Sequence, residues 1–199
     1  MCMNIPQLKF VYAYPLDGNQ RREFETETKE YPSQSEIKEI IVHWRELWSE
    51  TDKTLKIIDT ITKLTKRTPE RNLECFVYGA GLNAMSTPFL MPTRNRKGNK
   101  WTDEYFIQTI THEMFHIFLI SDNDKYWKMV SSKYANEDLV CQNHIILYAM
   151  LFELYKICFK YEPPDFSRDN LPAGYARAIE IVKEEGSEVL VAEYQSIVI

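Results

Sequence analysis

Residues 112–116 read His-Glu-Met-Phe-His, so two imidazoles and a carboxylate recur at a fixed spacing. In a helix, residues four apart lie on one face about one turn from each other, and His112 and His116 can then bind the same metal ion. Glu113 would stand beside a metal-bound water, where its carboxylate can act as a general base. The pentapeptide therefore predicts a metal site whose chemistry is the activation of water.

A helix that displays two histidines beside an apolar core, without any metal, is the structural alternative. The segment already has an apolar set at helical spacing, namely Phe106, Ile110, Met114, Ile117 and Phe118. Imidazoles add nothing to such a core and would need hydrogen-bond partners if they were buried. The pattern therefore favours metal ligation over a packing role.

In its helical setting, the pentapeptide resembles the active-site helix of the zincin metallopeptidases. The resemblance implies Zn²⁺ as the cofactor, His112 and His116 as metal ligands and Glu113 as the general base. It also implies a strand edge above the metal that binds extended substrate by strand addition, a place that residues 83–91 occupy in the chain order. The residues after His116 lack the glycine and the third histidine of the metzincin extension, which excludes that subgroup.

Zinc at a catalytic site usually takes three protein ligands and a water, and two residues compete to be the third ligand. Glu137 follows His116 at a separation similar to that of the gluzincins, and His144 begins an apolar run. A helix would put both on one face with Cys141, but roughly 10 Å apart, so only one can reach the ion. We favour His144, because Glu137 is also explained as an acid near a helix N-terminus, and Glu137 stays the alternative.

Peptide hydrolysis also needs a donor to the developing oxyanion. The last predicted helix opens with Tyr175 and Arg177, which we name as candidates, although solvated helix residues are the simpler interpretation. His43 lies far from the pentapeptide in sequence and is interpreted as a packed or partly exposed histidine. A di-iron helical bundle would need a second Glu-x-x-His pair, which the chain lacks.

Several secondary-structure elements are predicted from local signals. Strands are expected over 9–14 and 73–78, and an edge strand or irregular extended segment over 86–91. A capping box of Ser33 and Glu36 opens a helix, and a second helical pattern follows and stops before Pro69. The two are either continuous near residues 49–52 or separate. Further helices are expected over about 103–120 with Thr102 as N-cap, 125–133, about 137–160 with Asn136 as N-cap, and 173–185. Residues 21–30 are expected to form a loop or solvated extension after a turn at Asp17-Gly18, and 188–199 is ambiguous.

Length and composition are those of an ordinary globular protein, with 199 residues, 44% hydrophobic and 27% charged. We predict one domain over 1–199, with an N-terminal strand and helices in 1–70, the metal-site core in 71–160 and a C-terminal helix and tail in 161–199. The net charge of −5 does not suggest a nucleic-acid-binding face.

The expected location is the cytoplasm, without a membrane partner. The four cysteines show no CxxC spacing and the first ten residues form no apolar leader, which favours free thiols in a reducing compartment. The longest apolar run, 145–159, is too short and too charged to span a bilayer.

Together these patterns predict an α+β fold of zincin type, in which a small twisted mixed sheet packs on the HExxH helix and the remainder is mostly helical. The expected function is that of a zinc metallopeptidase, a hydrolase whose partner is a peptide or protein substrate. The alternative is a non-catalytic metal-binding module for structure or partner recognition, but Glu113 argues against it because a structural site needs no base.

Overall fold

The computed structural model describes residues 7–25, 30–68, 72–81, 83–95, 98–119 and 124–198. The chain divides into two compact units, residues 1–54 with 69–113 and residues 55–68 with 114–199. Helices and a small sheet occur together, so the predicted α+β class is confirmed at that level.

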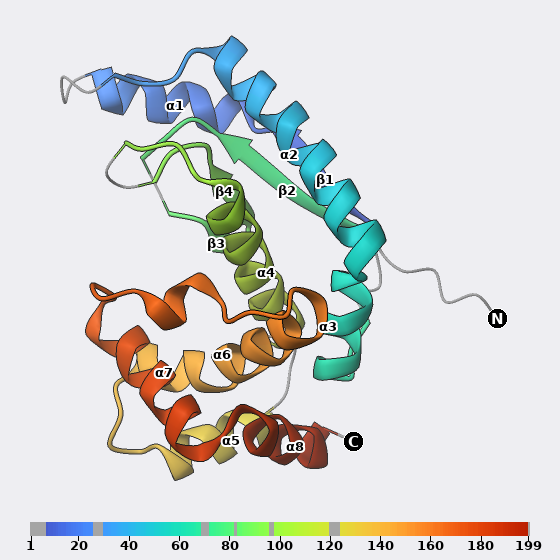
Figure 1. The fold of residues 1–199 in the computed structure, drawn as a ribbon. Coiled ribbons are helices and arrows are strands. Elements are labelled where there is room, and N and C mark those ends of the chain that lie inside the picture. Colours follow the sequence, from blue (N-terminus) through green and yellow to red (C-terminus); the bar gives the residue numbers. More distant parts are fainter. Residues whose placement is uncertain are drawn as a thin grey trace. The chain divides into compact units, whose positions relative to one another are not determined.

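The first unit contains the sheet (Figure 1). Its elements are β1 (Leu8–Tyr12), α1 (Tyr14–Glu25), α2 (Gln34–Leu55), β2 (Leu73–Tyr78), β3 (Met85–Ser86), β4 (Phe89–Pro92) and the start of α4 (Asp103–Leu119). The strand order is β1-β2-β4-β3, with β1, β2 and β4 parallel and β3 antiparallel to β4. The strand expected at 73–78 coincides with β2, and the extended segment expected at 86–91 overlaps the edge strand β3 and β4.

The two faces of this sheet are covered by different helices. On one face Phe10 of β1 packs with Trp44 of α2 and Phe106 of α4, and the two last rings stack at 4.4 Å between centroids. On the other face a buried cluster joins the start of α1 to β2 and β4 through Ala13, Tyr78 and Leu90. Phe106 thus packs the start of α4 against the sheet.

Helix α1 contradicts the predicted turn at Asp17-Gly18 and the loop expected over 21–30. The helix runs through this turn sequence to Glu25, because a proline such as Pro15 is tolerated in the first turn, where its N–H would have no partner. Asp17 is 1% exposed and accepts hydrogen bonds from distant groups instead of forming a local turn. Residues 26–29 lie outside the described residues.

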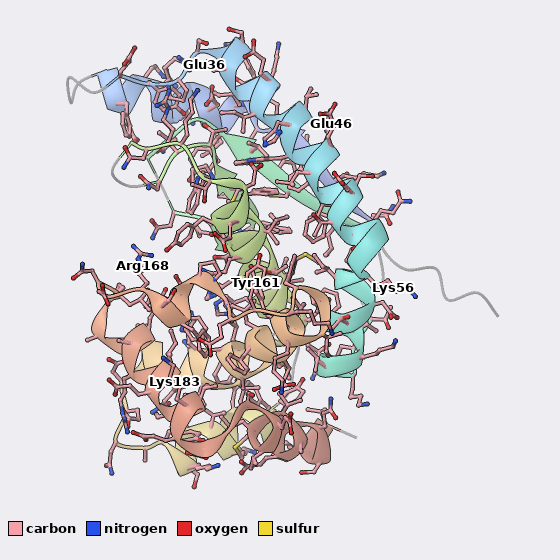
Figure 2. The ribbon with its side chains drawn as sticks, viewed as in Figure 1. Glu36, Glu46, Lys56, Tyr161, Arg168 and Lys183 are labelled. Atoms are coloured by element: carbon pink, nitrogen blue, oxygen red, sulfur yellow. The ribbon has the colours of Figure 1, made fainter. Side chains whose placement is uncertain are left out.

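The capping box predicted before α2 is confirmed. The Ser33 N–H donates to the Glu36 carboxylate at 2.9 Å and the Glu36 N–H donates to the Ser33 hydroxyl at 3.2 Å. The helix then ends beside Lys56, which has a left-handed backbone (φ 54°) and separates α2 from the next helix (Figure 2). The two helices are therefore distinct.

The second unit is helical (Figure 1). It contains α3 (Ile57–Thr65), the end of α4, α5 (Asp124–Lys133), α6 (Leu139–Cys158), a 3-10 turn η1 (Pro164–Ser167), α7 (Ala173–Glu185) and α8 (Ser187–Val198). The long helix α6 is buried along most of its length and packs against α3, α7 and α8. The helix predicted over 173–185 is confirmed as α7, and the C-terminal segment that the sequence left ambiguous forms α8.

Two further observations bear on the sequence predictions. Helix α4 ends at Leu119, and the helix end expected near residue 120 falls outside the described residues. Among the described residues, no helix combines the length and the apolar character needed to cross a membrane.

Candidate metal centre

The HExxH pentapeptide lies in α4, as its spacing predicts. Thr102 caps the helix, and its hydroxyl accepts a hydrogen bond from the Tyr105 N–H at 3.3 Å. The boundary between the two compact units falls inside this continuous helix, directly after Glu113. His112 and His116 therefore keep the one-turn spacing of a regular helix, on the face that Glu113 flanks.

Three histidines gather their ring nitrogens at this point of α4. The ligand atoms of His112, His116 and His144 all lie within 4.8 Å of one another. The Nε2 atoms of His116 and His144 are 3.2 Å apart, and their rings are nearly perpendicular. Two nitrogens bound to one tetrahedral zinc at 2.0–2.1 Å would be separated by about 3.4 Å. The arrangement fits a metal ion held by three nitrogen ligands.

Helix α6 fixes the ring of His144. Its Nδ1 lies 2.6 Å from the Val140 carbonyl, one turn earlier in the same helix. A carbonyl oxygen can only accept, so Nδ1 carries the proton and Nε2 of the neutral ring presents its lone pair toward His116. A hydrogen bond from the outer nitrogen to a carbonyl is the usual way in which proteins orient a metal-binding histidine.

The surroundings of His116 and His144 keep these two imidazoles neutral. Burial, with repulsion from His144 as a smaller cause, lowers the pKa of His116 to about 4. Burial also lowers the pKa of His144, although the hydrogen bond to Val140 and the charge of Asp165 oppose this shift. A neutral imidazole is the form that binds metal, so both rings are ready to act as ligands near pH 7.

The Glu113 carboxylate is buried in a different kind of environment. It is 9% exposed, and burial raises its pKa to about 7. Within the part of the chain that the structure describes, no hydrogen bond or ion pair to this carboxylate is found. Burial raises the pKa of the Cys75 thiol on β2, and the charge of Glu113 adds to this shift. A carboxyl group with such a pKa can take up and release a proton at neutral pH.

The alternative ligand Glu137 is not among the gathered atoms. Its carboxylate accepts a hydrogen bond from Arg177 Nε at 3.1 Å. The predicted N-cap Asn136 is wrong, because the Asp138 carboxylate caps α6 by accepting from the Cys141 N–H at 2.7 Å. The helix therefore begins at Leu139, and Glu137 precedes it instead of sharing a helical face with His144.

The two predicted oxyanion donors lie in different surroundings. The Tyr175 ring packs against the His144 ring, with 4.4 Å between the centroids. Arg177 instead pairs with three carboxylates, those of Glu137, Glu180 and Glu184. These hydrogen bonds raise the pKa of Arg177. Tyr175 thus lies beside His144, whereas Arg177 forms ion pairs with carboxylates of α7 and of the segment before α6.

Sequence reasoning missed two residues beside His144. Tyr148 follows one turn later on α6, its ring centroid is 5.9 Å from that of His144, and its hydroxyl donates to Asp165 at 3.0 Å. The spacing of four from His144 was a signal for Tyr148, but Asp165 comes from η1 and carries no local signal. Cys141 is buried, and His43 is exposed and pairs with Asp103 at 2.7 Å.

Comparison of the chain with protein-family models, with curated proteins and with solved structures gives no match. The chemistry of the site therefore has to be argued from its own residues.

Proposed function

We propose that this protein is a zinc-dependent peptidase of zincin type, in which His112, His116 and His144 hold the metal and Glu113 is the general base. The observation that carries the proposal is the convergence of the three imidazole nitrogens within 4.8 Å. Three nitrogen ligands with an open position are typical of catalytic zinc, whereas structural zinc is usually closed by four protein ligands.

A zinc ion held by these ligands would polarise the scissile carbonyl and lower the pKa of water to near 7. Glu113 follows His112 directly in α4, so its carboxylate can accept the proton of the attacking water and later deliver it to the leaving amine. Its desolvated position supports this role, because the proton is then neither held too tightly nor released too early.

Two other features support a peptide as the substrate. The sheet ends in a short strand, β3, and no other strand among the described residues pairs with its outer side, as addition of an extended chain requires. The Tyr175 ring packs on His144, so a phenol group accompanies the ligand set and can donate a hydrogen bond to an oxyanion.

The ligand set is tested by comparing zinc affinity in two single variants. We expect His144→Ala to weaken zinc binding by at least about 100-fold, because it removes one of three ligands. Glu137→Ala is the matched control and should bind zinc as the parent does, since its carboxylate pairs with Arg177. Competition titration with a chromogenic chelator measures both. Equal affinity of the parent and His144→Ala would reject this ligand set.

Catalysis is tested by Glu113→Gln, which keeps the size of the side chain and removes the base. Cleavage of a peptide library should fall by roughly 10²–10⁴-fold while the zinc content stays unchanged. The rival function, a non-catalytic metal-binding module, predicts that the parent itself cleaves no peptide while binding zinc fully. That outcome would retain the metal site and reject the peptidase.

A further inference from the structure

Gly174, in the first turn of α7, packs directly against the first turn of α6, the helix that α7 lies along (Figure 1). It is buried, and an added Cβ would lie 2.8 Å from both Asp138 Oδ1 and Val140 Cβ and 2.9 Å from Val140 Cγ1. Nonbonded carbon atoms prefer about 3.5–4.0 Å, so contacts this short are repulsive. The Val140 Cβ is bonded to the backbone of α6 and cannot rotate away. Only glycine therefore fits between the two turns at this separation.

The two residues that Gly174 contacts also orient the third ligand of the proposed metal centre. The same Asp138 Oδ1 accepts from the Cys141 N–H at 2.7 Å and caps α6. The Val140 carbonyl accepts from Nδ1 of His144 at 2.6 Å. A displacement of the first turn of α6 would thus move the cap and the carbonyl that fixes the imidazole.

The next residue of α7 makes a second contact with this ligand. Tyr175 directly follows Gly174, and its ring centroid lies 4.4 Å from that of His144. Pro172 precedes α7 and has no polar side-chain atom with which to cap it, so packing on α6 sets the position of this helix end. The close approach at Gly174 therefore also determines how the Tyr175 ring lies on His144.

An ion pair between Arg177 and Glu137 joins α7 to the segment before α6, but it is a weak restraint. The two side chains are 39% and 24% exposed, and Arg177 Nη1 also pairs with other carboxylates of α7. Exposed ion pairs between flexible side chains contribute little. The buried contact at Gly174 is the tighter of the two links.

We propose that Gly174 is a positioning residue for the metal centre: its missing side chain lets the first turns of α6 and α7 touch, and this contact holds His144 in its metal-binding orientation with Tyr175 against it. The inference rests on the proposed ligand set and is independent of the reaction that the metal supports. A glycine with only a packing role would change the stability of the fold but not the metal affinity of the folded protein.

The first test compares zinc affinity in two variants that carry the same substitution. Gly174→Ala should weaken zinc binding by about tenfold or more, as changes to groups that orient a ligand do. Gly18→Ala, in a helix where the added Cβ meets nothing within 4 Å, should leave the affinity unchanged. Competition with a chromogenic chelator measures both, and circular dichroism verifies that the variants are folded.

The second test needs no metal. In the chelator-treated parent, ¹⁵N NMR of the imidazoles should show His144 as the tautomer with its proton on Nδ1, because the Val140 carbonyl accepts there. Gly174→Ala should give a mixture of the two tautomers. If the parent binds no zinc, the proposed ligand set is rejected, and these spectra still test the effect of Gly174 on His144.

Variants of Val140 test the contact from the α6 side. Val140→Gly removes both Val140 atoms that the added Cβ would meet, so Gly174→Ala should lose less zinc affinity in that background than in the parent. Val140→Ala is a milder change that serves if Gly174→Ala does not fold, and it should weaken zinc binding several-fold. Val42→Ala on α2 is its matched control, since the two valines are 50% and 42% exposed at positions 42 and 140, and it should have no effect.

Three outcomes would overturn the proposal. In the first, Gly174→Ala, or Val140→Ala in its place, binds zinc as tightly as its control, which would leave Gly174 a packing role only. In the second, affinity falls while His144 keeps a single tautomer, so that the loss does not pass through this ligand. In the third, the loss caused by Gly174→Ala is the same with and without the Val140 side chain.

Discussion

Two buried carboxylates in the first unit have opposite surroundings. Asp17 of α1 accepts hydrogen bonds from the hydroxyls of Tyr12 and Tyr31, both at 2.7 Å, and from the Gly79 N–H at 2.8 Å. Glu113 of α4 is buried almost as deeply, and the described residues provide it with no such donor. The Asp17 carboxylate is therefore hydrogen-bonded, whereas the Glu113 carboxylate remains able to take part in chemistry.

The difference indicates a structural role for Asp17 and a role in chemistry for Glu113. The donors around Asp17 connect α1 to the segment before α2 and to the end of β2. Burial without donors disfavours the charged form of Glu113, which raises its pKa and lowers the stability of the fold at neutral pH. A group that costs stability and adjoins potential metal ligands is typical of a functional site.

Asp17→Ala should have the largest effect on stability. It leaves two tyrosine hydroxyls and a buried N–H without their acceptor, so we expect the free energy of unfolding to fall by about 3–5 kcal/mol. Urea denaturation followed by circular dichroism measures the change. Asp59→Ala, which removes only an exposed pair with Lys63, is the control and should cost less than about 1 kcal/mol. Equal losses in the two variants would remove the contrast between Asp17 and Glu113.

The pH dependence of stability tests Glu113 in the chelator-treated protein. Its pKa in the folded state, about 7, lies above the ordinary value of 4.5, so the folded protein prefers the protonated form. This contribution is fully present below pH 4.5 and is lost as the pH rises through about 7, by at most about 3 kcal/mol. The difference in unfolding free energy between the parent and Glu113→Gln should follow this curve. A difference that is constant from pH 4.5 to 8 would contradict the desolvated state.

Tyr31→Phe should lower the free energy of unfolding by about 2 kcal/mol, because it removes one hydrogen bond to a buried charged acceptor. Thermal and urea denaturation both measure the loss. Tyr14→Phe changes a ring that is 61% exposed and should have almost no effect. If both variants unfold alike, the Asp17 centre does not depend on its donors.

Two glycine substitutions should have opposite signs. A Cβ at Gly79 would overlap the Tyr31 ring, so Gly79→Ala should push that donor off Asp17 and cost about 1–2 kcal/mol. Gly18→Ala meets no atom within 4 Å in the interior of α1 and should stabilise the fold by up to about 1 kcal/mol. In a Tyr31→Ala background the cost at Gly79 should vanish, and a cost that persists would place the strain elsewhere.

Elements whose ends are set by neighbouring residues were predictable from the sequence. The capping box of Ser33 and Glu36 and the limits of α7, between Pro172 and Gly186, depend on local chemistry. Helix α1 was not predictable in this way, because Pro15 and Asp17-Gly18 are equally typical of a turn. Two of the groups that donate to Asp17, the Tyr31 hydroxyl and the Gly79 N–H, lie 14 and 62 residues away along the chain, beyond any local pattern.

The same limit applies to the candidate site. The spacing of His112, Glu113 and His116 is a property of one helix and is visible in the sequence. The choice between His144 and Glu137 depends on which residue caps α6, and Asn136 and Asp138 are both good N-caps. Asp165 accepts from Tyr148 because η1 folds onto α6, and no residue spacing in the sequence predicts this contact.

The hydrogen bond from His144 to the Val140 carbonyl links ligand geometry to fraying of a helix end. Val140 is in the first turn of α6, which the Asp138 cap holds closed. When that turn opens, the carbonyl rotates away and the imidazole loses its orientation, although no residue of the ligand set has changed. A bound ion would oppose the opening by RT ln(1 + [metal]/Kd), so metal and cap would stabilise the same turn. Metal affinity would then report on the melting of a single helical turn.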